Sequence, residues 1–229
     1  MTRSLYSVII VCILLTLSVS AYANSGIVLS FQGLGDQQVV GNFYNGGGLP
    51  STPNYGIVFS SNFLGLRSTA NGGAGFFNST PVGTPAIFVT GPSNGAAVTG
   101  VMNVMNGFQS GLNFYYAFNL PGGFKGLQNV TVTIWSGANG SGNVLATISL
   151  SANGCQNSSP SFCQWSSAGT SFSGNAHSVT FAGPSNFFGL SDVTLGSSGT
   201  AIPEPSTLFL LGTGLVGISL GRVRRFLGL

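Results

Sequence analysis

"VTVTIWSGANGSGNVLATISL", residues 130–150, is the stretch that decides the fold class of this chain. Val130, Val132 and Ile134 alternate with polar or aromatic residues, and this period of two places them on one face of a half-buried strand. The run Val144–Leu150 repeats the pattern after the glycine-rich connection SGANGSGN. The two runs are therefore predicted to form an antiparallel hairpin.

Short apolar or alternating runs recur along residues 24–200, and almost no helical periodicity is present. The expected strands are Ile27–Phe31, Gly56–Ser60, Ala86–Thr90, Ala97–Met105, Leu112–Asn119, Val130–Trp135, Val144–Leu150, Ser178–Ala182 and Asp192–Leu195. Short strands at this spacing predict an all-β domain, an antiparallel β-sandwich or jelly roll, with an open barrel as the alternative. Segment 67–84 is expected to be a long loop.

Charged residues make up only 4 % of the 229 residues, against roughly 25 % in ordinary soluble domains. Between residues 24 and 201 the only charges are Asp36, Arg67, Lys125 and Asp192, which sum to zero. A nucleic-acid-binding protein needs a basic patch that neutralises phosphates. Nucleic acid is therefore not expected as a partner.

The N-terminus has the three parts of a secretory signal peptide. Arg3 supplies the positive region, Val8–Val19 the apolar region, and Ala21 and Ala23 the small residues of a cleavage site. Residues 1–23 are therefore predicted to form a helical signal peptide that is removed before Asn24. An uncleaved membrane anchor is the alternative, and the shortness of the apolar stretch disfavours it.

The C-terminus has a second apolar segment, Thr207–Gly221, which is predicted to be a transmembrane helix. Its 15 uncharged residues span roughly 22 Å as a helix, short of the about 30 Å hydrocarbon core, so flanking arginines would have to snorkel or the bilayer to thin. Arg222, Arg224 and Arg225 form the basic end, residues 222–225, that predicts a cytoplasmic stop. The body would then lie outside the membrane and the last residues inside.

The same segment contains a literal G-x-G-x-x-G at residues 212–217, the glycine pattern of dinucleotide-binding folds. That pattern requires a preceding strand and an acidic residue about 20 positions further on. Only 12 residues follow Gly217, and none is acidic. The glycines are better explained by close helix packing in a membrane, and no cofactor is expected.

The order of parts in residues 202–225 resembles the PEP-CTERM sorting signal of Gram-negative bacteria: a Pro-Glu-Pro triplet, a glycine-punctuated apolar segment and basic residues. The resemblance implies that an exosortase, a membrane-embedded transpeptidase-like enzyme, recognises Pro203, Glu204 and Pro205 in the tail 201–229 and cleaves nearby. The extension Phe226–Leu229 departs from the pattern, since such tails commonly stop near the basic cluster. A stiff linker that ends the last strand is the alternative role of the triplet.

The body resembles the β-sandwich modules commonly found ahead of such tails, in residues 41–66, 107–117, 130–150 and 172–197. The resemblance implies a carbohydrate-binding-like or galactose-binding-like jelly roll and names no ligand. The last strand of those modules often carries an Asp-Asn pair. Here Ser191 and Asp192 stand in its place.

Two cysteines remain after removal of the signal peptide, Cys155 and Cys163. In an oxidising compartment such a pair is predicted to form a disulfide, worth roughly 2–3 kcal/mol for so small a ring. Zinc binding is the alternative, but zinc requires four ligands and the chain has a single histidine. No metal site is predicted, although one Asp with backbone carbonyls would suffice for weak calcium binding.

Catalytic residues are not expected. Residues 91–95 read G-x-S-x-G around Ser93, but no helix follows, and His177 precedes Asp192, against the order of a nucleophile elbow. The segment is typical of a β-turn, and His177 is expected to be an exposed or locally bonded loop residue. Two-carboxylate glycosidase chemistry has only Asp36 and Asp192 available in the body, and both suit turns as well.

These features predict a noncatalytic exported protein of the cell surface or extracellular matrix, first an inner-membrane-anchored precursor and then at the outer surface or outside a Gram-negative cell. The expected partners are the exosortase, the membrane and extracellular polysaccharide. A carbohydrate-binding module is the alternative, with four aromatic candidates for sugar stacking, at least half of them expected in the core: Tyr115, Tyr116, Trp135 and Trp165. An exported hydrolase would use Ser93 and His177, and ice binding is disfavoured because the threonines are scattered along the sequence.

Overall fold

The structure of this chain is a computed structural model that describes residues 26–75, 77, 80–118, 129–153, 162 and 164–196. All of them belong to one compact unit, Ser25–Gly199. Within these ranges no helix is long and apolar enough to span a membrane. Several predictions concern residues outside the described ranges and stay predictions: the signal peptide with Ala21, Ala23 and Asn24, the disulfide of Cys155 and Cys163, and the tail with its helix, Pro203, Glu204, Pro205, Arg222, Arg224 and Arg225.

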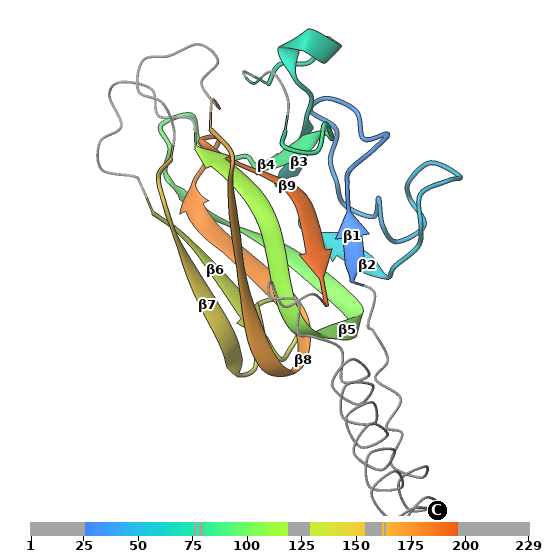
Figure 1. The fold of residues 1–229 in the computed structure, drawn as a ribbon, viewed down its shortest axis with the longest axis vertical. Coiled ribbons are helices and arrows are strands. Elements are labelled where there is room, and N and C mark those ends of the chain that lie inside the picture. The colour runs from blue at the N-terminus through green and yellow to red at the C-terminus, as the bar shows by residue number, and fades with distance from the viewer. Residues whose placement is uncertain are drawn as a thin grey trace, which may run out of the picture. The chain divides into compact units, whose positions relative to one another are not determined.

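The described chain forms a nine-stranded antiparallel sheet, which confirms the all-β prediction (Figure 1). The strands are β1 (Ile27–Leu29), β2 (Ile57–Phe59), β3 (Phe63–Leu66), β4 (Ala86–Val89), β5 (Ala97–Phe118), β6 (Asn129–Trp135), β7 (Val144–Ser151), β8 (Ser166–Pro184) and β9 (Phe188–Leu195), with one 3-10 helix, η1 (Thr69–Asn71). Their order is β3-β4-β9-β5-β8-β6-β7, with β1 beside β9 and β2 beside β5.

Strands β5 and β8 are the longest and pair with each other along most of their length, from Ala97 opposite Pro184 to Tyr116 opposite Ser166. Their register shifts twice between Asn103 and Ser110, and such bulges bend a strand. Before the bend, β5 also pairs with β2, and β8 pairs there with β6. After the bend, β5 pairs with β9.

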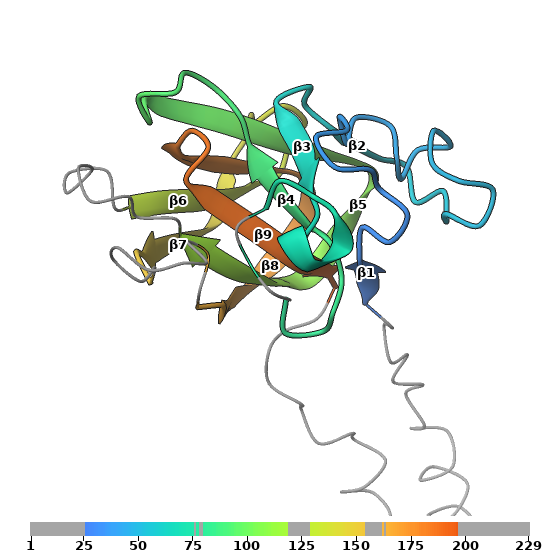
Figure 2. The ribbon, with the colours of Figure 1, turned by 90° about the horizontal axis from the view of Figure 1, so that it is seen from above.

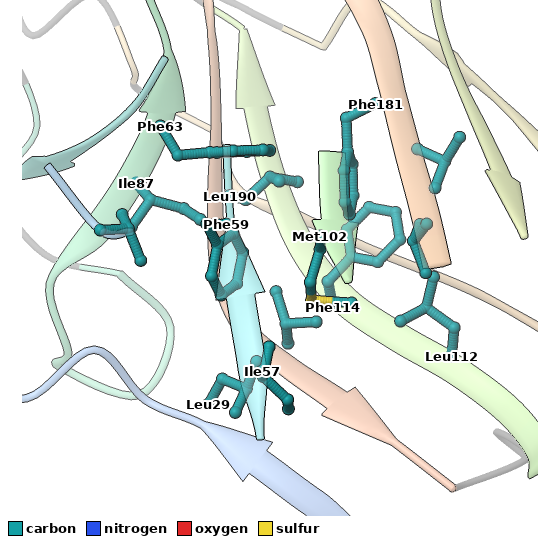
Figure 3. Close-up of a cluster of buried hydrophobic side chains, with 14 of the residues drawn as sticks. Leu29, Ile57, Phe59, Phe63, Ile87, Met102, Leu112, Phe114, Phe181 and Leu190 are labelled. Carbon is teal, nitrogen blue, oxygen red and sulfur yellow. The ribbon is translucent and has the colours of Figure 1, made fainter. Parts of the chain in front are cut away.

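The bend divides the sheet into two layers. We call β2, the first half of β5, the second half of β8, β6 and β7 the β6 layer. The β9 layer consists of β1, β3, β4, β9, the second half of β5 and the first half of β8. Phe181 of the β6 layer packs edge-on against Phe63 and Phe114 of the β9 layer, with ring centroids 5.8 and 6.0 Å apart (Figure 3). The layers thus enclose one apolar core, as a β-sandwich does.

The hairpin predicted from residues 130–150 is confirmed. Val130 pairs with Leu150, and Val132 pairs with Ile148. Val130, Val132 and Ile134 are fully buried, which confirms the predicted alternation on β6.

Several strand assignments made from the sequence were wrong, among them Asp192–Leu195, which is only the second half of β9 (Phe188–Leu195). Ala97–Met105 and most of the predicted strand Leu112–Asn119 belong to one continuous strand, β5, which ends at Phe118, because the glycine-containing segment between them is a bulge rather than a turn. Ser178–Ala182 is only the last part of β8, which begins at Ser166. The four-residue strand β3 was not predicted. The first half of β8 has no apolar alternation, so its strand conformation depends on pairing with β5.

A second apolar cluster lies on the outer face of the β9 layer. It contains residues of β3, β4 and β5 together with two from irregular segments: Leu66, Phe77, Ala86, Phe88, Ala117 and Phe162. Segment 67–85 supplies Phe77 and carries η1; outside η1 its described residues are turns, bends, an isolated bridge and irregular chain. Figure 2 shows this segment in front of β4 and β9. The loop predicted at 67–84 therefore covers one face of the sandwich.

The pairing register gathers threonines on the outer face of the β6 layer. Thr147 of β7 lies opposite Thr133 of β6, and Thr133 lies opposite Thr180 of β8. Thr131 lies on the same face, two residues before Thr133. Residues that are scattered in the sequence thus form an uncharged, hydroxyl-bearing surface.

Candidate functional site: a polar pocket beside Arg67

Three charged residues fall within the described ranges, Asp36, Arg67 and Asp192, and all three adjoin segment 67–85. Asp36 Oδ1 accepts the backbone N–H of Arg67 at 2.8 Å. Asp36 Oδ2 accepts the backbone N–H of Ala74 at 2.9 Å. One carboxylate therefore holds two points of the segment, on either side of η1.

Asp192 holds the other end of the segment. Its Oδ2 accepts a hydrogen bond from Thr84 Oγ1 at 2.8 Å and another from Ser191 Oγ. The backbone N–H of Thr84 in turn donates to Thr80 Oγ1 at 2.8 Å. Asp192 has a φ of 51°, in the left-handed region that Asp tolerates better than most residues, and this conformation interrupts the regular alternation of β9.

A pocket of about 220 Å³ lies between these two anchors. Its lining is mostly polar: Gln32, Arg67, Ser68, Asn71, Phe77, Gly83, Thr84 and Pro85. Ser68 is only 3 % exposed, and its Oγ has no hydrogen-bond partner among the described residues. A buried hydroxyl without a partner costs about 1–3 kcal/mol, and most buried polar atoms do have a partner.

The apolar part of the pocket belongs to the second cluster. Phe77 is buried and packs edge-on against Trp165, with ring centroids 5.7 Å apart. Trp165 Nε1 is also buried without a partner in the described part of the chain. The pocket thus combines an aromatic residue with amide, hydroxyl and guanidinium groups.

The chemistry that this pocket supports is hydrogen bonding rather than metal coordination. Neither Asp36 nor Asp192 lines it, and the carboxylates of both accept hydrogen bonds from groups of the protein itself. Within the described ranges no three His, Cys, Asp or Glu side chains are grouped as metal ligands.

The predicted hydrolase residues are not brought together. Ser93 is exposed in a turn closed by a bond of 3.3 Å from the Gly95 N–H to the Pro92 carbonyl. His177 lies within β8, not in a loop as expected, and its Nε2 is 3.1 Å from Asn175 Nδ2. Ser93 lies before Ala97, the first residue of β5. His177 is next to Ser178, which pairs with Asn103, six residues further along that strand. Six residues of a strand span about 20 Å.

His177 instead lines a wider hollow of about 400 Å³ on the other layer. The remaining lining is apolar or neutral: Val58, Asn103, Val104, Met105 and Ala138. No group suited to acid–base catalysis accompanies the histidine in this lining.

The four aromatic candidates for sugar stacking are all half-buried. Trp135 donates from Nε1 to Thr180 Oγ1 at 2.9 Å, and Tyr116 packs edge-on against Phe118. Trp165 packs against Phe77 as described above. Three of the four therefore serve the packing of the domain.

Sequence reasoning missed the residues that make the pocket, apart from Arg67, which it identified only as a charge. Gln32, Ser68, Asn71 and Thr84 are isolated polar residues in glycine-rich segments, and no spacing marks them. The single signal was the scarcity of charge: the only charged residues of the described body lie around this pocket.

Comparison with known proteins identifies a known motif near the C-terminus of the chain. Residues 201–225 match the PEP-CTERM protein-sorting motif, which confirms the resemblance seen in the sequence and is consistent with an exosortase substrate. The motif implies an exported protein of a Gram-negative bacterium. No curated protein matches the chain.

Adhesin and carbohydrate-binding domains are among the solved structures that resemble this chain. The K1 cleaved adhesin domain of Lys-gingipain from Porphyromonas gingivalis W83 is 12 % identical over 77 % of this chain and 100 % of that chain, with a TM-score of 0.45. CsCBM6-3 from Clostridium stercorarium, in complex with cellobiose, is 18 % identical over 53 % and 80 %, with a TM-score of 0.32. The xylan-binding domain from CBM 22 is 11 % identical over 64 % and 90 %, with a TM-score of 0.37.

Proposed function

We propose that this chain, which ends in a PEP-CTERM sorting motif at residues 201–225, is a noncatalytic protein of the cell surface or extracellular matrix. An exported precursor is held in the inner membrane by the helix 207–221 and the arginines that follow it, until an exosortase processes the tail. The sorting motif is the observation that carries this proposal. The signal peptide predicted at residues 1–23 supports it, because both ends then agree that the body lies outside the cytoplasm.

The body supports a binding or structural role rather than a catalytic one. Its described surface offers mainly hydroxyl and amide groups, among them the threonine face of the β6 layer. Its two described carboxylates accept hydrogen bonds that hold segment 67–85 in place, which supports a structural role for both. Neutral hydrogen-bonding groups suit contact with a hydrated polymer.

Mass spectrometry of the protein recovered from fractionated producing cells tests this function. The expected protein is in the envelope or medium, begins at Asn24 and ends close to Pro203–Pro205. Recovery of the whole chain from the cytoplasm, with residues 1–23 still present, would overturn the proposal.

A second candidate function is carbohydrate binding, and the polar pocket beside Arg67 favours it. Amide and hydroxyl side chains beside an aromatic residue suit the alternating polar and apolar surface of a sugar. A glycan array probed with the full chain in mild detergent, with and without calcium, tests this function. Absence of binding to every glycan under both conditions would remove it and would leave the proposed sorting untouched.

A further inference from the structure

The polar pocket beside Arg67 contains a hydrogen-bonding group that the protein itself leaves unused. Ser68 is buried and lines the pocket, and its Oγ has no partner in the described part of the chain. Buried polar atoms in native proteins are almost always hydrogen-bonded. An exception in the wall of a pocket marks a place where a ligand group completes the bonding.

Arg67 gives the pocket its only formal charge. The two carboxylates in the described part of the chain accept hydrogen bonds from other groups: Asp36 from backbone N–H groups and Asp192 from hydroxyls. The exposed guanidinium therefore keeps its donors for another acid, within the part of the chain that is described. Its planar fork matches a carboxylate through two parallel hydrogen bonds.

The remaining lining is neutral and can both donate and accept. Gln32 and Asn71 carry amides, and Thr84 carries a hydroxyl. The volume of about 220 Å³ corresponds to roughly seven waters at about 30 Å³ each, which is small for a drug-sized ligand. Such a space takes one sugar ring at a time, as a chain end or a branch.

We propose that this pocket binds an acidic sugar of a polysaccharide, one that carries a carboxylate such as a uronic acid. The carboxylate pairs with Arg67, and the ring hydroxyls bond to Ser68 and to the neighbouring amides. The inference rests on the second function proposed above, carbohydrate binding, and adds the chemical class of the ligand and the residues that select it.

Calorimetric titration of the full chain in mild detergent tests the inference, with glucuronic and galacturonic acid oligosaccharides compared with their neutral glucose and galactose counterparts. The acidic ligands are expected to bind about twofold to fivefold more tightly at low salt, because the carboxylate pairs with Arg67 but solvent weakens a pair at an exposed guanidinium. Raising the salt concentration is expected to reduce that preference.

Two variants identify the residues. Arg67→Gln is expected to abolish the preference for acidic ligands, and Ser68→Ala is expected to weaken the binding of both classes. Arg67→Gln keeps the backbone N–H that Asp36 accepts, so unchanged thermal unfolding shows that the fold persists. Gln109→Ala, at an exposed position on the β5 bend, is the matched control and should bind as the unmodified protein does.

The outcomes separate the inference from the function on which it rests. Equal binding of neutral and acidic ligands, unaffected by Arg67→Gln, would overturn the inference that the ligand is acidic. It would leave the proposed carbohydrate binding in place. Binding that neither Arg67→Gln nor Ser68→Ala alters would overturn this pocket as the site. No binding of any saccharide would overturn both proposals.

Discussion

At the scale of single residues, Tyr44 shows how one polar side chain attaches an irregular segment to the core. Its hydroxyl accepts the backbone N–H of Phe31 at 2.6 Å, and its ring packs against Phe31, Phe43 and Tyr55. Burial raises the pKa of Tyr44 to about 12. The neutral phenol is therefore part of what stabilises the folded state.

This shift of the Tyr44 pKa predicts a loss of stability at alkaline pH. Below pH 10 the phenol is neutral in both states and its contribution is fully present; between pH 10 and about 12 only the unfolded state ionises. The free energy of unfolding should then fall by about 1.4 kcal/mol per pH unit through Tyr44. Urea unfolding from pH 8 to 12 should show a shallower decline in the free energy of unfolding for Tyr44→Phe than for the unmodified protein. At neutral pH the variant should also be less stable by about 1–3 kcal/mol, because the Phe31 N–H loses its partner. Equal alkaline slopes would contradict this role of Tyr44.

Phe181 links the two layers at the same scale. It is 1 % exposed and contacts Phe63 and Phe114 from the opposite layer. Phe181→Ala is expected to lower the free energy of unfolding by about 3–5 kcal/mol, because it leaves a cavity in the core, and Phe181→Leu by less. Val144→Ala, at a position that is 53 % exposed, should change it by less than about 0.5 kcal/mol. Similar effects of Phe181→Ala and Val144→Ala in urea would contradict the assignment of this core.

At the scale of elements, a glycine decides how closely β3 approaches β5. A Cβ atom at Gly100 would lie 2.4 Å from Cε2 and 2.5 Å from Cζ of Phe63. Phe63 is fully buried and has little room to move in a close-packed core. The absence of a side chain at Gly100 therefore allows this ring to lie over β5.

Gly100→Ala is expected to destabilise the domain by about 1–3 kcal/mol through overpacking. Gly189→Ala in β9 is the matched control, because the nearest atom to a Cβ there is Trp165 Cη2 at 3.5 Å, an ordinary contact. That substitution should be neutral or stabilising by up to about 1 kcal/mol, since alanine restricts the unfolded chain. Thermal unfolding of both variants measures the contrast, and equal shifts would refute it.

The elements also differ in how well the sequence predicts them. The β6–β7 hairpin was predicted because its alternation and its glycine-rich connection are local signals. The continuity of β5 and the first half of β8 were missed, because both depend on pairing between segments far apart in the chain. The residues of β8 before the bend are small and polar, and cross-strand partners rather than propensity make them a strand.

At the scale of the whole molecule, the described body and the sorting motif occupy separate parts of the chain. The described body contains both apolar clusters within Ser25–Gly199, and the sorting motif lies beyond it at residues 201–225. Changes in the tail should therefore alter the destination of the protein without altering the stability of the sandwich.

Replacing Pro203, Glu204 and Pro205 together with alanine is expected to block processing. The variant should accumulate in the membrane fraction with its C-terminus intact to Leu229, and intact-mass measurement of both fractions detects this. Pro53→Ala, at an exposed proline of the body, is the control and should be processed normally. Normal processing of the triple variant would assign the triplet the role of a linker.

Local patterns in the sequence predicted the all-β fold class and the sorting motif, because alternation and the order of parts in a tail are properties of neighbouring residues. Long-range pairing and packing set which strands are continuous, which layers face each other and what lies around the pocket. Asp36 and Asp192 are remote in the chain, and both adjoin segment 67–85 because their carboxylates bond to donors of that segment. Residues far apart in the sequence become neighbours because both faces of the bent sheet must be buried at once. A local sequence pattern does not contain this information.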